Sequence, residues 1–363
     1  MRIYRTSRLP VQLGLVALTL CPLAPISAAP SLNAYAGSVG GSGIGTVPGG
    51  CGNAPSPIFS FFSFNFVLPT EGIGPCGYSG AVVQSTAATG PLASSYTLPP
   101  VSLGPLPGSG SFDGSAQSIA NYTGLGANAH ANIGTGRPGG NSMFQSIGAA
   151  TLQDSLTATS PLVANLSAGF VRYQFSVDGS LQSLGVPEPG YFGETYMVLD
   201  MQHQGGLVYQ VLNATVRRGG IGTISNRQPP AGWVTSTGSL SGGSNFFSFD
   251  FPINWGQAWE IKVGLMAWAY GSADSNFLST ARLTGLSMFD ANRQPVTNFS
   301  LSAASGTDYL AAPIPEPQTW VLWLLGLTGL ARLGRRRRET GVDPHGACQR
   351  WGGPPSSIQG RVA

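Results

Sequence analysis

The chain has 363 residues, of which only 9% are charged, and its formal net charge at pH 7 is +3. Glycine and proline number 52 and 28, which is typical of a turn-rich β protein and not of a helical enzyme. Of the 18 basic residues, 3 precede residue 29 and 7 follow residue 312, so the body between holds 8 against 12 acidic residues. The body is mildly acidic, which makes nucleic acid an unexpected partner.

The first 28 residues have the three parts of a secretory signal peptide. Arg2, Arg5 and Arg8 precede an apolar stretch at residues 11–20, and the small residues Ser27-Ala28-Ala29 follow. The apolar core is too short to span a bilayer, and its flanks suit cleavage after Ala28. We therefore expect residues 1–28 to direct export across the inner membrane and to be removed.

The expected export of the protein determines how its four cysteines are interpreted. Cys21 lies in the signal peptide and Cys348 lies near the C-terminus, which leaves Cys51 and Cys76 in the body. In an oxidising compartment this pair is expected to form a disulfide. Closing a loop of about 25 residues would stabilise the fold by roughly 3 kcal/mol.

The C-terminal region combines a rigid tripeptide, an apolar helix and a basic block. Pro315-Glu316-Pro317 is held extended by its prolines. An apolar run at residues 319–333 follows as a short transmembrane helix, and its anchoring side chains include Trp320, Trp323, Leu325 and Leu330. The basic block, which fixes the cytoplasmic side of the helix, consists of Arg335, Arg336, Arg337 and Arg338.

These three parts in this order resemble the PEP-CTERM sorting domain of Gram-negative bacterial surface proteins, here at residues 313–338. The motif has also been labelled an ice-binding protein C-terminal domain, a label that implies no ice binding. The resemblance implies recognition by an exosortase, a membrane-embedded cysteine transpeptidase, and transfer of the ectodomain to the cell surface or to exopolysaccharide. The alternative is an ordinary C-terminal membrane anchor. Residues 339–363 are expected to be a disordered tail.

The body is predicted to be all-β, as an antiparallel sandwich or jelly roll. Residues 29–141 are expected to be a Gly/Pro-rich region with some strands, followed by the sandwich domain at 142–312. In the first region we expect a strand at 58–66, short edge strands or loops at 80–107, and a loop at 121–141. In the second, alternating patterns predict strands at 170–177, 196–201, 207–216, 233–239, 246–251, 259–269, 281–289 and 296–301. Asp178-Gly179 is predicted to be a hairpin turn.

No established catalytic motif is found, and the protein is predicted not to be an enzyme and to need no cofactor or metal. His203 is interpreted as a turn residue, and the dinucleotide-like spacing at residues 134–139 as a loop. The acids Glu188, Glu194, Asp200, Asp250 and Glu260 are expected at turns or strand edges. The alternative is that two of them form a glycosidase pair.

Two further groups of residues have open alternatives. The aromatic residues Trp233, Trp255, Trp259, Trp268 and Tyr270 are expected in the core, although they could form a flat platform for sugar rings. Asp274-Ser275-Asn276 and Asp290-Ala291-Asn292 are expected in turns, although alternating oxygen ligands could hold Ca²⁺.

The sequence therefore predicts an exported β-sandwich of the cell envelope or exopolysaccharide matrix. Its expected partners are signal peptidase, exosortase, the inner membrane during export, and exopolysaccharide. The alternatives are a carbohydrate-binding module and a glycan-active enzyme. Binding to a glycan array would favour the first, and loss of turnover in Glu→Gln variants the second.

Overall fold

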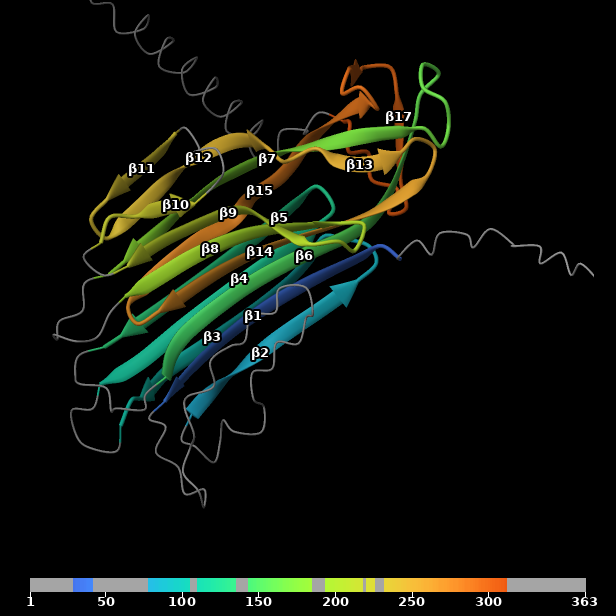
Figure 1. Cartoon of the computed structure of the whole chain (residues 1–363). Helices are drawn as coiled ribbons and strands as arrows, with labels where there is room; N and C mark the ends of the chain where they lie inside the picture. Colours follow the sequence, from blue (N-terminus) through green and yellow to red (C-terminus); the bar gives the residue numbers. More distant parts are fainter. Residues whose placement is uncertain are drawn as a thin grey trace, which may run out of the picture. The chain divides into compact units, whose positions relative to one another are not determined.

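The computed structural model describes residues 29–41, 78–104, 110–134, 143–184, 193–217, 220–225 and 232–311 (Figure 1). Within these ranges every regular element is a β-strand and every strand pairing is antiparallel. All the strands belong to one compact unit that ends at Leu310. The described ranges contain no helix long and apolar enough to span a bilayer.

The strands form two sheets, A and B. Sheet A has the order β10 (Thr223–Ser225), β9 (Val208–Arg217), β8 (Glu194–His203), β14 (Ala258–Tyr270), β6 (Met143–Thr159), β1 (Ser31–Gly41) and β2 (Tyr78–Ala87), and β17 (Ser300–Ala303) also pairs with β6. Sheet B has the order β11 (Trp233–Ser236), β12 (Ser239–Phe247), β7 (Ala168–Ser183), β15 (Ala273–Asp290), β5 (Gly124–Ile133), β4 (Ser111–Asn121) and β3 (Leu92–Ser102). The short strands β13 (Phe251–Asn254) and β16 (Pro295–Val296) pair with β7 and β15.

The two sheets pack face to face, which confirms the predicted all-β, sandwich-like fold. Along β7 the odd-numbered residues from 169 to 177 are buried and the even-numbered ones are partly exposed, as expected for a strand with one core face. In one part of the core, large side chains from both sheets meet, among them Tyr173, Phe175, Met197, Trp259 and Phe277.

In another part of the interior the sheets approach closely over small side chains. Gly148 of β6 faces sheet B, and a Cβ atom there would overlap the carbonyl oxygens of Gln117 and Asn128. Gly114 is held in the same way against the hydroxyls of Ser38 and Ser146. Close approach therefore requires glycine at these positions, because any larger side chain would push the sheets apart.

Strands from both predicted regions share these sheets. β1 pairs with β6 over its whole length, and β5 pairs with β15. The two sheets therefore include strands from both sides of the predicted division between residues 141 and 142. β1 obtains its second strand neighbour, β6, and β5 its second neighbour, β15, only from the second region.

Five local predictions are wrong. Asp178 and Gly179 lie inside β7, because that strand pairs on both sides, with β12 and β15, beyond the turn-like dipeptide. The predicted loop at 121–141 contains β5. The predicted strands at 233–239, 246–251 and 296–301 are each divided between two shorter or separate strands. Residues 80–107 do form edge strands, but β2 and β3 are 10 and 11 residues long. The strand predicted at 58–66 lies outside the described residues.

Candidate functional site

Most of the sequence-predicted site residues lie outside the described ranges. These are the signal peptide, Cys51 and Cys76, and everything from residue 312 onward, including Pro315, Glu316 and Pro317. Along the chain, the last described residues before the C-terminal segment are those at the end of the sandwich, up to Ala311.

That end of the sandwich is fixed by Asp154, a fully buried residue of β6. Its carboxylate accepts hydrogen bonds from the backbone N–H of Ser155 at 2.8 Å and of Ser305 at 3.1 Å. It also accepts from the Ser305 hydroxyl and, at 2.9 Å, from the Tyr309 hydroxyl. Burial beside Asp154 raises the pKa of Tyr309, which keeps the phenol protonated as a donor. We call Asp154, Ser305 and Tyr309 the clasp, since they hold the chain that follows β17 against β6.

The five aromatic residues predicted as core or platform separate into different environments. Trp255 and Trp259 are buried in the core, as expected. Trp233 is half-buried at the edge of sheet B, where its ring stacks on Phe277 with centroids 6.2 Å apart. Its indole N–H donates to the Ser244 hydroxyl at 3.0 Å.

Trp268 and Tyr270 lie on the outer side of sheet A beside Tyr196, which the sequence did not single out. The centroid distances from Trp268 are 4.7 Å to Tyr196 and 5.6 Å to Tyr270, and the Tyr270 ring is nearly parallel to the indole. Because these rings use their faces to contact each other, they do not form the flat sugar platform considered above.

Among the described residues, Glu194, Asp200 and Glu260 lie too far apart to form the carboxylate pair of a glycosidase. Glu194 and Asp200 are six residues apart on β8, or roughly 20 Å along the strand, against about 5–10 Å for catalytic pairs. Glu260 is four residues along β14 from Gly264, the partner of Asp200, which is roughly 13 Å. Glu194 is also paired with Arg217 at 2.8 Å. Glu188 lies outside the described residues.

Asp250 is part of an ion-pair cluster. Its carboxylate accepts two hydrogen bonds from Arg172, at 2.7 and 3.0 Å, and one from Arg293. The guanidinium of Arg172 lies over Phe289, and that of Arg293 lies over Phe170. These contacts join β7 to the end of β15 and to the turn after it, which indicates a structural role.

The prediction that His203 is a turn residue is wrong. His203 is the last residue of β8, and its ring lies in the core. Its Nε2 donates to the carbonyl of Pro252 at 3.1 Å, so its Nδ1 accepts from the Tyr173 hydroxyl at 3.2 Å. That hydroxyl accepts from the Trp259 indole N–H at 2.9 Å. Burial lowers the pKa of His203 to about 4, so the ring is neutral at pH 7.

The two candidate Ca²⁺ segments are differently placed. Asp274, Ser275 and Asn276 lie within β15, where the Ser275 side chain is buried and its two neighbours point to the opposite face. The Asp290 carboxylate accepts from the backbone N–H of Asn292 and of Gln294, both at 2.8 Å, which is the expected turn. Within the described ranges no three His, Cys, Asp or Glu side chains are grouped to share a metal ion.

The outer face of sheet B carries rows of neutral polar side chains. Gln117 of β4, Asn128 of β5 and Asn276 of β15 are register partners on adjacent strands, and we call them the amide row. Ser95 of β3 and Ser180 of β7 extend this row at its two ends.

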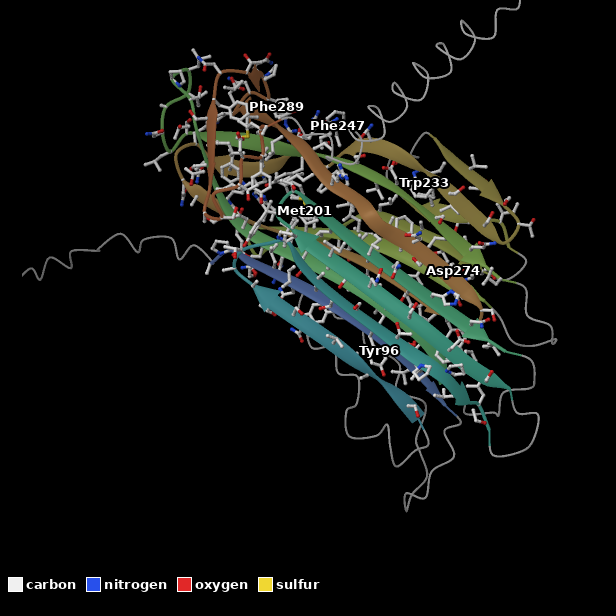
Figure 2. All side chains as sticks on the ribbon, turned by 180° about the vertical axis from the view of Figure 1, so that it is seen from behind. Tyr96, Met201, Trp233, Phe247, Asp274 and Phe289 are labelled. Carbon is white, nitrogen blue, oxygen red and sulfur yellow. The ribbon has the colours of Figure 1, made fainter. Side chains whose placement is uncertain are left out.

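A second row lies two residues along the strands from the amide row, and it contains an ion pair. His130 of β5 pairs with Asp274 of β15, and this hydrogen bond raises the pKa of His130. Ser115 and Gln182 are its neighbours on the flanking strands. In Figure 2, Asp274 and Phe289 mark the two ends of β15, so this polar region and the Asp250 cluster lie at opposite ends of the strand. The sequence could not reveal these rows, because they depend on strand register.

Comparison with known proteins identifies one segment. Residues 313–338 match the family model of the PEP-CTERM protein-sorting motif. No curated protein and no solved structure matches the chain. The motif implies export, a membrane-anchored sorting signal and recognition by an exosortase. The chain is therefore a β-sandwich followed, at residues 313–338, by a PEP-CTERM protein-sorting motif.

Proposed function

We propose that the protein is a non-enzymatic component of the cell surface or of the exopolysaccharide matrix of a Gram-negative bacterium. In this proposal the signal peptide starts export, and the exosortase cuts the C-terminal segment near Pro315-Glu316-Pro317 and releases the sandwich from the membrane. The observation that carries the proposal is the sorting motif at residues 313–338, which begins three residues after Leu310.

A structural rather than catalytic role is supported by three of the described acids, Asp154, Asp250 and Glu194, and by His203. Asp154 and Asp250 are saturated with hydrogen-bond donors, and Glu194 is paired with Arg217. His203 is buried with both ring nitrogens in hydrogen bonds. Groups that are fully paired in the ground state are poor candidates for moving protons to a substrate.

Association with polysaccharide is supported by the composition of the chain. Only 9% of its residues are charged, whereas soluble domains average about 25%. A surface of amides and hydroxyls can exchange hydrogen bonds with a hydrated polymer without having to desolvate charges. A carbohydrate-binding module is the second candidate function, and the same neutral, polar composition supports it.

The test of sorting is the intact mass of the protein from wild-type cells and from cells that lack the exosortase. We expect a mass ending near Pro315 in wild-type cells and a longer chain, extending past Arg338, in the mutant. The same longer mass in both strains would refute exosortase processing and indicate an ordinary membrane anchor.

A further inference from the structure

We propose that a neutral polysaccharide binds across the outer face of sheet B, over the amide row and the depression beside it. This inference rests on the proposed association with polysaccharide and assigns it a surface and a chemical class. It is carried by four observations: unpaired amides, a depression with one apolar wall, a rigid backing and the charge of the neighbouring residues.

The amide row offers hydrogen-bonding groups that the described part of the chain does not use. The side chains of Gln117, Asn128 and Asn276 make no hydrogen bond to another residue in the described part of the chain, and those of Gln117 and Asn276 are exposed. Each amide both donates and accepts. Since a sugar hydroxyl also does both, three amides on strands about 4.8 Å apart form a continuous line of complementary groups.

A depression of about 210 Å³ adjoins the amide row at Gln117. It is lined by Ala93, Ser94, Ser95, Gln117, Ser118, Ile119 and Leu278. Leu278 reaches it because β15 bulges there and its backbone crosses Gly126, where a Cβ atom would overlap the Leu278 carbonyl. Ile119 and Leu278 therefore supply an apolar wall, and Gln117 and Ser95 a polar one. A sugar ring has the same division between C–H surface and hydroxyl groups.

The strands that carry the row are held rigidly from behind. Gly148 of sheet A contacts the backbone of Gln117 and Asn128 directly, with no side chain between the sheets. Register pairing on both sides fixes β5 between β4 and β15. Side chains on such a backbone are arranged before a ligand arrives, which lowers the entropy lost on binding.

The charged groups near the row favour a neutral polymer over an acidic one. His130 is paired with Asp274, and Asp113 accepts a hydrogen bond from Asn132 at 3.0 Å. Asp178 lies farther along the same face and is exposed. The face thus carries Asp113, Asp178 and Asp274 against Arg282 and the paired His130, and this excess of carboxylates favours a neutral polysaccharide over an anionic one.

The test is affinity electrophoresis of the mature exported protein in gels that contain dextran, galactomannan or hydroxyethyl cellulose, with alginate as the anionic polymer. Gln117→Glu and Asn128→Asp keep the shape of the side chains but replace donors with charge. Ala93→Tyr fills the depression without adding charge. Gln210→Glu is the matched control, because Gln210 is an exposed glutamine on β9 of the other sheet.

We expect at least one neutral polymer to retard the wild-type protein and alginate not to. The three variants on sheet B should weaken that binding at least tenfold, and Gln210→Glu should leave it unchanged. Equal binding by all variants would overturn the assigned surface but not the association with polysaccharide. Binding to alginate alone would overturn the neutral class, and binding to no polymer, including the cells' own secreted polysaccharide, would overturn both proposals. A change of oligomeric mass in Gln117→Glu, measured by light scattering, would instead identify the face as a contact between two copies.

Discussion

Replacing Asp154 by asparagine should loosen the end of the sandwich that leads into the sorting motif. The substitution keeps the size of the side chain, so it leaves no cavity, but it removes the charge and one acceptor oxygen. Four donors converge on the carboxylate, from Ser155, from Ser305 twice and from Tyr309. The side-chain NH₂ group of the asparagine must then face some of these N–H and O–H donors, so at least one buried donor loses its acceptor.

The expected loss can be worked from these contacts. A hydrogen bond to a charged group contributes about 1.5–3 kcal/mol, and a buried donor left unpaired costs about 1–3 kcal/mol. Because the bonds share one carboxylate they are not additive, so we expect the free energy of unfolding to fall by about 3 kcal/mol. Tyr309→Phe removes one donor and should lower it by about 1.5 kcal/mol.

The assay is urea unfolding followed by tryptophan fluorescence, together with limited proteolysis of the native protein. In the Asp154→Asn variant the first cleavage should move into the segment after Ala303, where the clasp residues Ser305 and Tyr309 lie. Ala304→Ser is the control, because Ala304 lies in the same segment, is exposed and is not a clasp residue. If Asp154→Asn matched this control in both stability and cleavage pattern, the clasp would have no role in holding the segment.

Two buried groups should give opposite dependences of stability on pH. The pKa of His203 is about 4 in the folded protein and 6.5 in the unfolded chain, so the unfolded state binds a proton first as pH falls. Stability is therefore lost as pH falls from 6.5 to 4, by about 3 kcal/mol. His203→Phe should abolish this loss. Asp200 is nine-tenths buried, its Oδ1 has no hydrogen-bond partner among the described residues, and burial raises its pKa to about 7 from 3.8. Its folded state holds a proton that the unfolded state releases first, so stability is lost as pH rises from about 4 to 7. Asp200→Asn should therefore stabilise the protein at pH 8, by roughly 4 kcal/mol, and have little effect at pH 4. Thermal unfolding from pH 4 to 8 checks both, and equal slopes in wild type and variants would contradict the assigned pKa shifts.

The strands that could be predicted are those whose two faces differ in polarity. β8, β9, β14 and β15 alternate large apolar residues with polar ones, and the sequence located all four. β4, β5 and β6 were not located, because alanine, serine and glycine occupy much of both faces and leave little hydrophobic contrast. Those small residues are required where the sheets approach closely, as at Gly148. The small residues that allow the two sheets to approach each other at these strands therefore also remove the alternation by which a strand is recognised in the sequence.

The placement of His203 shows that a turn signal in the sequence locates a turn only to within a residue or two. The sequence Gln202-His203-Gln204-Gly205-Gly206 does contain a turn, and its positive φ angles fall at Gln204 and Gly205. His203 lies one residue earlier, still in β8, where alternation turns its ring inward with Met197, Leu199 and Met201. A shift of one residue therefore separates an exposed turn residue from a core residue. The amide row has the same origin, since Gln117, Asn128 and Asn276 meet only through the register of three strands.

The order of elements along the chain keeps folding separate from sorting. The last strand ends at Ala303, the last clasp residue is Tyr309, and the matched motif begins at residue 313. A cut at Pro315–Pro317 would therefore break none of the described contacts, and the released protein would keep both sheets, the clasp and the amide row. Because Ser305 and Tyr309 follow β17 along the chain, they are synthesised after the described strands, and a closed clasp requires that those strands have already been made. The structure thus allows the protein to fold fully before the exosortase acts and to keep the same binding face afterwards.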